Sequence, residues 1–234
     1  MVLDFPVQDP ENSSLKLAAL GLLGVGRGRF VPSTVRALDG ISLQIRPGDR
    51  IGLFGANGAG KSSLLRTIAG IYPPTSGTVE TRGKLATLLG LKAGTLGEMS
   101  AEANIRMLLR IDGVKPTDAL VDAIWAFTEI DDSFRAIPLR SFSAGMQMRL
   151  LFSVATSVKA DVLLLDEWLS AADADFTAKS EKRLGDFIGG AKILVFASHN
   201  RKRLASICTR IAILSAGRIV SIQPAEAFGQ VEAD

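Results

Sequence analysis

The chain has 234 residues with 47% apolar side chains, a fraction that excludes a disordered protein. Its 27 basic and 24 acidic residues leave a formal net charge of +3, which is too balanced to indicate a nucleic-acid partner. The length favours one α/β domain with an inserted lobe over two independent domains. The single cysteine, Cys208, cannot form an internal disulfide and indicates a reducing compartment, and we interpret it as a core or surface thiol.

Residues 1–29 are predicted to form an N-terminal extension. Their apolar stretch, residues 17–25, is too short to span a bilayer and lacks the positive leader of a secretion signal, so we expect the chain to stay in the cytosol. The basic flanks of this stretch leave two interpretations open, an interfacial or partner-facing helix and a packed N-terminal segment.

Two strands are predicted next, followed by a glycine-rich loop. Alternating apolar and polar residues over 35–45 predict the first strand, and a turn at residues 47–49 leads into the apolar run Arg50–Phe54. The sequence GANGAGKSS follows directly at residues 55–63, and the helical pattern LLRTIAG comes after it. This context is typical of a phosphate-binding loop and disfavours the alternative of an ordinary glycine turn.

The residue types in this loop suit a polyphosphate. Gly55, Gly58 and Gly60 allow successive backbone amides to approach an anion. Lys61 adds a positive charge for the β- and γ-phosphates, and the hydroxyl of Ser62 suits a Mg²⁺ that keeps most of its oxygen shell. The following helix points its positive N-terminal end at the same anion. We therefore predict a site for a nucleotide with Mg²⁺.

The remaining elements surround a helical lobe. Strands are predicted at residues 77–81 and 85–89, and residues 95–159 are mostly helical. Three segments in that range, AEANIRMLLRI, DALVDAIWAFTEI and AGMQMRLLFSVATSV, place apolar residues three and four apart, with Pro116 and Pro138 between them. Four strands follow, VLLLD, ILVFAS, RIAIL and RIVSI, of which the last two are joined by a turn. A nucleotide-binding core interrupted by a helical lobe is expected.

Three polar residues follow two of these strands. Asp166 ends the apolar run VLLLD, where a carboxylate would hold Mg²⁺ through water. Glu167 comes next and is placed to orient and deprotonate the water that attacks the γ-phosphate. The only histidine, His199, follows ILVFAS, where its imidazole would contact the γ-phosphate or the attacking water. The alternatives are a strand end stopped by solvated charges and a structural or exposed histidine.

The order of phosphate loop, helical lobe, FSAGMQMRL, LLLLDE, SAAD and a histidine after the next strand resembles the ATP-binding cassette ATPases. The resemblance covers the chain from Phe30 onward. It implies an α/β P-loop NTPase core, over residues 30–234, with an N-terminal antiparallel β subdomain and an inserted α-helical subdomain at about 95–159. Phe30 would stack on adenine, although a buried core phenylalanine is the competing interpretation.

The resemblance also implies a head-to-tail homodimer with two ATP molecules at its interface. The family's signature sequence caps the γ-phosphate bound by the opposite subunit, and here it reads Ser143, Ala144, Gly145 and Met146 after a phenylalanine. Asp173 matches the loop by which the subunits communicate. The resemblance implies that Glu167, His199 and Lys61 are the catalytic residues. It implies that Ser62 and Asp166 bind Mg²⁺. The predicted ATP contacts within one subunit are Phe30, Gly55, Asn57, Gly58, Ala59, Gly60, Lys61, Ser62 and Ser63.

One departure from the family is substantial. The family usually carries a glutamine after the strand that leads into the helical lobe, where it touches Mg²⁺ and senses the membrane partner. No glutamine occurs between Gln44 and Gln147, and Gly90 occupies the expected region. Coupling between the nucleotide site and the membrane partner would then use backbone groups or Glu98, or it would be weaker than in the family.

The departures resemble one subfamily. Methionine in place of the signature glutamine, the run LLGLKAGTLGEMSAEANI and the run DEWLSAADADF look like the ATPases of polysaccharide and O-antigen exporters, including capsule and teichoic acid relatives. This likeness implies a motor subunit that pairs with a multispanning permease, peripheral to the cytoplasmic face of the inner membrane, and exports a lipid-linked polysaccharide. The alternatives are an importer ATPase, a soluble cassette ATPase without a transport role, and a regulatory module without turnover.

Overall fold

The computed structural model describes residues 1–6, 34–89, 94–166 and 174–230. A two-stranded antiparallel sheet joins β1 (Leu3–Pro6) to β2 (Thr34–Leu38). A six-stranded sheet has the order β4-β5-β6-β3-β7-β8, with β8 antiparallel and the other five strands parallel. Its strands are β3 (Arg50–Phe54), β4 (Leu85–Leu88), β5 (Val162–Leu165), β6 (Ile193–Ala197), β7 (Arg210–Ser215) and β8 (Arg218–Pro224).

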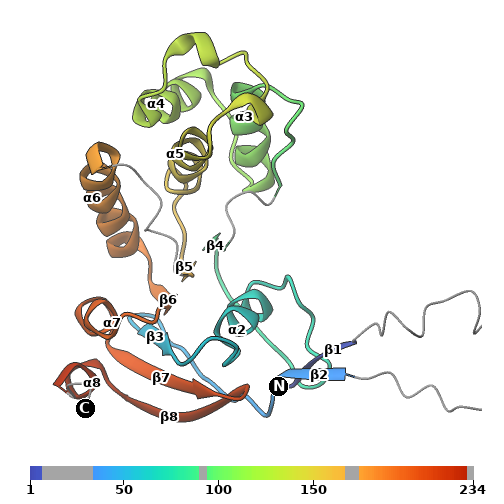
Figure 1. Cartoon of the computed structure of the whole chain (residues 1–234), viewed down its shortest axis with the longest axis vertical. Coiled ribbons are helices and arrows are strands. Elements are labelled where there is room, and N and C mark those ends of the chain that lie inside the picture. Colours follow the sequence, from blue (N-terminus) through green and yellow to red (C-terminus); the bar gives the residue numbers. More distant parts are fainter. Residues whose placement is uncertain (7–33, 90–93, 167–173, 231–234) are drawn as a thin grey trace, which may run out of the picture.

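The helices fall into two groups by the core that they enter, and Figure 1 shows α6 of the first group standing beside the second group. One group packs against the large sheet and consists of α2 (Lys61–Ile68), α6 (Ala174–Gly190), α7 (Arg201–Ile207) and α8 (Ala225–Gln230). The other forms a separate helical subdomain of α3 (Ala101–Ile111), α4 (Asp118–Thr128), α5 (Ala144–Ala155) and the short 3₁₀ turns η1 (Asp132–Phe134) and η2 (Leu139–Ser141). The structure thus confirms the predicted α/β fold with an inserted helical subdomain.

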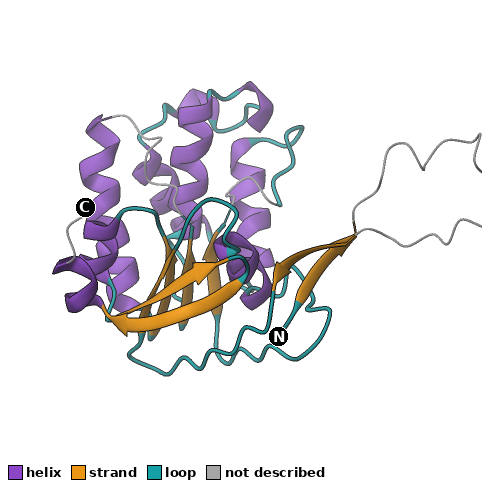
Figure 2. Ribbon diagram, turned by 60° about the horizontal axis from the view of Figure 1, so that its bottom comes forward, coloured by secondary structure: helices purple, strands orange, loops and turns teal. Residues whose placement is uncertain are grey.

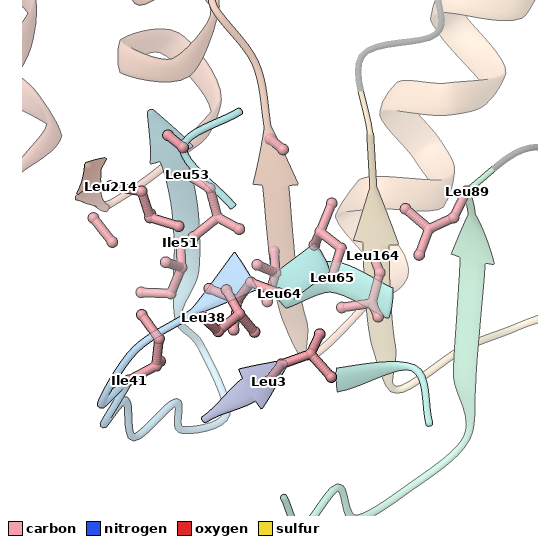
Figure 3. Close-up of a cluster of buried hydrophobic side chains, with 14 of the residues drawn as sticks. Leu3, Leu38, Ile41, Ile51, Leu53, Leu64, Leu65, Leu89, Leu164 and Leu214 are labelled. Atoms are coloured by element: carbon pink, nitrogen blue, oxygen red, sulfur yellow. The ribbon is translucent and has the colours of Figure 1, made fainter. Parts of the chain in front are cut away.

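The central strands of the large sheet, β3, β5, β6 and β7, are buried on both faces, which explains why they are mostly apolar runs. Alternate residues of β5 divide between two core clusters, with Leu164 on the side of α2 and Leu163 on the side of α6, α7 and α8. Figure 3 shows the first cluster, in which Leu64 and Leu65 of α2 pack with Leu38 of β2 and with sheet residues such as Leu164. Figure 2 shows the small two-stranded sheet beside the large one.

Residues 1–6 pack with this core. β1 pairs with β2, the side chain of Leu3 is buried in the first cluster, and the guanidinium of Arg36 donates to the Asp4 carboxylate at 2.9 Å. Residues 7–29, the rest of the predicted N-terminal extension, lie outside the described residues, as does its apolar stretch. Within the described part of the chain, no helix has both the length and the apolar character needed to cross a bilayer.

Two predicted strands differ from the structure. The strand predicted over 35–45 ends at Leu38, because the chain turns at Gly40, whose φ is 67°. Residues 77–81, all described, form no strand, since only Ser76 makes an isolated bridge, to Val2. The sequence pattern of residues 77–81 therefore did not produce a strand, because no other described segment pairs with these residues.

The thiol of Cys208 belongs to the second core cluster. The residue is 7% exposed, and burial raises the pKa of its thiol to about 12. A protonated, enclosed thiol is a poor nucleophile. Of the two predicted alternatives, a core or a surface thiol, the structure shows the core thiol.

A buried amide, the side chain of Asn104, organises the start of the helical subdomain. It is fully buried on α3, accepts from the amide of Leu96 at 2.9 Å, and donates to the carbonyls of Leu96, Met99 and Ser100 at 3.0 to 3.1 Å. These four bonds fix the loop that enters α3. Apolar side chains of α3, α4 and α5 then form a core of their own.

Replacing Asn104 with leucine is expected to destabilise the protein by about 3 kcal/mol, because backbone groups of the loop lose their partners while they stay buried. For a chain of this size the midpoint of thermal unfolding should fall by about 6–12 °C. Circular dichroism melting measures this change, and a midpoint equal to that of the wild type would show that solvent replaces the amide without cost.

Candidate active site

The parallel strands bring three predicted segments to one edge of the sheet. β6 lies between β3 and β5, with Leu53 beside Ala197 and Leu165 beside Phe196. The phosphate loop therefore begins beside the end of β6, and Asp166 follows β5 at the same edge. The amide of Ser198 donates to the carbonyl of Leu53 at 3.2 Å and ties the end of β6 to the end of β3. This is the edge where α/β sheets bind ligands.

The phosphate loop depends on glycines whose backbone other residues adopt with strain. Gly58 and Gly60 have φ values of 80° and 102°. A Cβ on Gly58 would meet nothing within 4 Å, whereas one on Gly60 would lie 2.8 Å from the carbonyl oxygen of Ala37. Gly60 also precedes α2 directly, and its carbonyl accepts from the amide of Leu64 at 2.8 Å. A side chain at Gly60 would therefore clash with the chain at the end of β2.

A second segment supports the loop from behind. The amide of Gly217 donates to the carbonyl of Ala59 at 3.1 Å, and the carbonyl of Gly217 accepts from the amide of Asp39 at 2.8 Å. Ala59 is 5% exposed. The turn between β7 and β8 thus links β2 to the phosphate loop. A turn between these two strands was predicted, but no signal in the sequence indicates which distant loop that turn contacts.

Lys61 lies over the loop that it follows. Its Nζ donates to the carbonyls of Gly55 and Ala56, at 2.6 and 3.0 Å. These bonds hold the ammonium group beside the loop backbone, where a polyphosphate would approach it. The first turn of α2 contains no acidic residue, and Gly60 offers no side-chain cap, so no carboxylate of that turn competes for the amides. The loop and α2 together form an anion-binding arrangement.

The residues predicted to hold Mg²⁺ provide oxygen ligands only. Ser62 lies in the first turn of α2, and Asp166 follows β5; both side chains are partly buried. Among the described residues, no group of three or more His, Cys, Asp or Glu side chains could form a complete metal cage. A hydroxyl and a carboxylate with the remaining positions left to water and phosphate suit Mg²⁺, which dehydrates reluctantly. The residues present therefore fit this ion.

His199 is exposed at the same edge, between two polar contacts of the backbone. The amide of Asn200 donates to the Ser198 hydroxyl at 3.1 Å, and the Asn200 side chain accepts from the amide of Arg203 at 3.0 Å, which caps α7. These contacts fix the backbone on both sides of His199. His199 thus follows the end of β6 at this edge of the sheet, and its contact with a nucleotide stays a prediction.

The signature residues lie on a different body of the molecule. Ser143 caps α5 and accepts from the amide of Met146 at 3.2 Å, and Ser143, Ala144 and Gly145 are exposed. The neighbouring Phe142 is buried against Phe134 with its ring edge-on. Figure 1 shows α5 in the helical subdomain, well apart from α2. The structure therefore does not bring the signature residues to the phosphate loop of the same chain.

Four predicted residues fall on segments outside the described residues. They are the adenine-stacking Phe30, Gly90 at the position of the absent glutamine, the general base Glu167, and Asp173.

The sequence model of the ABC transporter family matches residues 38–170. This chain belongs to the ABC transporter family. It is 43% identical over 226 residues to "O-antigen export system ATP-binding protein RfbE" of Yersinia enterocolitica, across 94% of this chain and 93% of that protein. As a member of this family the chain is an ABC-type ATPase that binds ATP, and the resemblance stated from its motifs is confirmed.

Two further relatives are longer than this chain. "Teichoic acids export ATP-binding protein TagH" of Levilactobacillus brevis is 39% identical over 192 residues, which cover 81% of this chain and 53% of that protein. "O-antigen export system ATP-binding protein RfbB" of Myxococcus xanthus is 39% identical over 189 residues, which cover 80% and 43%. The chain spans about half the length of these two relatives.

Solved structures agree with the fold. The dimeric structure of a post-hydrolysis state of the ATP-binding cassette MJ0796 bound to ADP and Pi has a TM-score of 0.66 at 19% identity, over 83% of this chain and 93% of that one. An ATP-binding subunit of an ABC transporter has a TM-score of 0.67 at 19% identity, over 81% and 84%. The family's P-loop fold is therefore also found by structural comparison.

Proposed function

We propose that this chain is the ATP-hydrolysing motor subunit of an ABC exporter that moves a lipid-linked polysaccharide, such as O-antigen, across the inner membrane. The geometric observation that carries the ATPase part is the shared sheet edge, where the phosphate loop, Asp166 and His199 follow β3, β5 and β6. The likeness to RfbE over 94% of the chain supports the exporter part, and none of the three relatives described above has a name that points to import or to a soluble role.

The proposed site divides the work among the chain's own residues. The loop amides and Lys61 bind the phosphates of ATP, and Phe30 stacks on adenine. Ser62 and Asp166 would hold Mg²⁺, which would neutralise charge on the phosphates. Glu167 orients the attacking water and takes its proton, and His199 contacts the γ-phosphate or that water.

The second half of the site comes from another copy of the chain. Ser143, Ala144, Gly145 and Met146 are proposed to cap the ATP held by the partner subunit in a head-to-tail homodimer, with Asp173 in the communicating loop. Their exposure at the start of α5 and the separation of α5 from α2 support this proposal. A capped helix start without an acidic residue in its first turn favours an anion.

The remaining assignments follow from the export function. The partner would be a multispanning permease, through which the chain would lie at the cytoplasmic face of the inner membrane without crossing it. We also propose the division of the chain into an extension, residues 1–29, and a cassette, residues 30–234, with residues 1–6 packed on the cassette as described above.

Hydrolysis of ATP by the purified chain, with and without membranes that contain the permease encoded beside it, tests the function. We expect the permease to stimulate wild-type hydrolysis and Glu167→Gln to lower kcat by about hundredfold or more while ATP still binds. Equal activity with and without the permease would contradict the export function and leave the ATPase intact. Normal turnover by Glu167→Gln would contradict the assignment of the base.

A further inference from the structure

Two cations of α6 lie against one aromatic ring of α4. The Nζ of Lys179 lies 4.5 Å from the centroid of the Phe127 ring, and the guanidinium carbon of Arg183 lies 4.0 Å from the same centroid. Lys179 and Arg183 are four residues apart on α6 and therefore share a helix face. We call Phe127, Lys179 and Arg183 the α4–α6 clamp.

Hydrogen bonds reinforce the clamp. Lys179 donates to the carboxylate of Glu129 at 2.6 Å and to the carbonyl of Phe127 at 3.3 Å, and Arg183 donates to the carbonyl of Ser153 on α5 at 3.4 Å. The ion pair with Glu129 is 38% and 48% exposed, so by itself it contributes only about 0–1 kcal/mol. Burial lowers the pKa of the Arg183 guanidinium, and a cation stacked on a ring is worth more when it is desolvated.

Glu129, which pairs with Lys179, has a left-handed backbone conformation. Glu129 caps the C-terminal end of α4 with φ 56° and ψ 27°, a left-handed conformation that only one other non-glycine residue, Ala216, approaches among the described residues. A left-handed residue often ends a helix, and for a residue with a Cβ it costs about 1–2 kcal/mol that the surroundings must offset. The bond from Lys179 to the Glu129 carboxylate provides one such constraint.

The clamp connects the helical subdomain, which carries the signature residues, to α6, which packs on the large sheet. α6 also packs on the large sheet, through Leu184 and Ile188 of the second core cluster. α4 and α5 belong to the helical subdomain, and the start of α5 carries the signature residues. At its other end α6 begins at Ala174, directly after the segment 167–173 that contains Glu167 in sequence. α6 therefore joins the helical subdomain to the chain that directly follows the segment 167–173.

We propose that Lys179 and Arg183 are positioning residues for ATP hydrolysis, which hold α6 to the helical subdomain so that contact between the signature residues and the partner's ATP moves α6 as well. This inference rests on the proposed homodimeric ATPase. It makes the clamp a determinant of turnover and leaves ATP binding at the phosphate loop to other residues.

The first experiment compares kcat, KM and the equilibrium dissociation constant for ATP in four full-length variants. Arg183→Met and Phe127→Leu remove the stacking and keep side-chain size, Arg183→Lys retains a cation, and Lys182→Met is the control on an exposed neighbour in α6. We expect Arg183→Met and Phe127→Leu to lower kcat by about tenfold with less than about twofold change in ATP affinity. Arg183→Lys should recover most of the rate, and Lys182→Met should match the wild type.

A second experiment tests the coupling between ATP binding and α6 and does not depend on ATP hydrolysis. Hydrogen–deuterium exchange reports whether addition of ATP protects the amides of α6. We expect ATP to increase protection over residues 174–183 in the wild type and in Lys182→Met, and to leave it unchanged in Arg183→Met. Equal protection in Arg183→Met and the wild type would overturn the inference, as would a parallel loss of ATP affinity, kcat and thermal stability. A wild type that binds ATP without hydrolysing it would instead contradict the motor function, and the exchange data would still decide the clamp.

Discussion

Replacement of Lys61 with alanine is expected to lower kcat/KM for ATP by about a hundredfold to a thousandfold, which is the usual cost of removing one charged donor from a phosphoryl-transfer site. The Lys61 ammonium bonds to the carbonyls of Gly55 and Ala56 and lies beside the loop amides. No other basic side chain belongs to the described loop, residues 55–60, so the variant has no substitute for this charge. Steady-state hydrolysis and equilibrium ATP binding measure the effect.

The control for Lys61→Ala is Lys202→Ala, which removes the same charge from an exposed position on α7. We expect its activity to equal that of the wild type. Thermal melting of both variants separates lost chemistry from lost folding, because Lys61 bonds only to exposed or partly buried loop carbonyls. Retention of more than about a tenth of the wild-type kcat/KM in Lys61→Ala would contradict the assignment of this lysine.

Replacement of Gly60 with alanine is expected to destabilise the protein by about 3 kcal/mol and to abolish ATP binding. A left-handed backbone costs a residue with a Cβ about 1–2 kcal/mol, and here the new Cβ would also stand 2.8 Å from the carbonyl oxygen of Ala37 and 3.1 Å from the side chain of Leu38. Relief of these contacts would shift the turn that positions the loop amides and Lys61. Thermal melting should show a midpoint about 6–12 °C below that of the wild type.

The matched control for Gly60→Ala is Gly58→Ala in the same loop. Gly58 also has a positive φ, 80°, but a Cβ there would meet nothing within 4 Å. We therefore expect only the conformational cost, about 1–2 kcal/mol. Equal destabilisation by the two substitutions would mean that the contact with Ala37 is relieved without cost and that backbone strain alone explains the effect.

Much of the candidate site could be predicted from the sequence because its parts are short and local. A glycine-rich loop between an apolar strand and a helix has few structural alternatives, and polar residues that end buried strands must emerge at the carboxyl edge of a parallel sheet. The strands β3 and β5 and the helices α3, α4 and α5 were predicted for the same reason, since burial on one or both faces leaves a regular apolar pattern. The subfamily likeness also came from motifs alone.

Contacts between distant segments were decided only by the tertiary structure. The sequence does not indicate that residues 3–6 pair with β2, that Gly217 supports the phosphate loop, or that residues 77–81 lack a strand partner. Nor does it place Lys179 and Arg183 around Phe127, because the three residues acquire their geometry only when α6 packs against α4 and α5. The physical reason is common to all of these cases: a local pattern determines which faces of an element are apolar, whereas the identity of the partner depends on the packing of the whole chain.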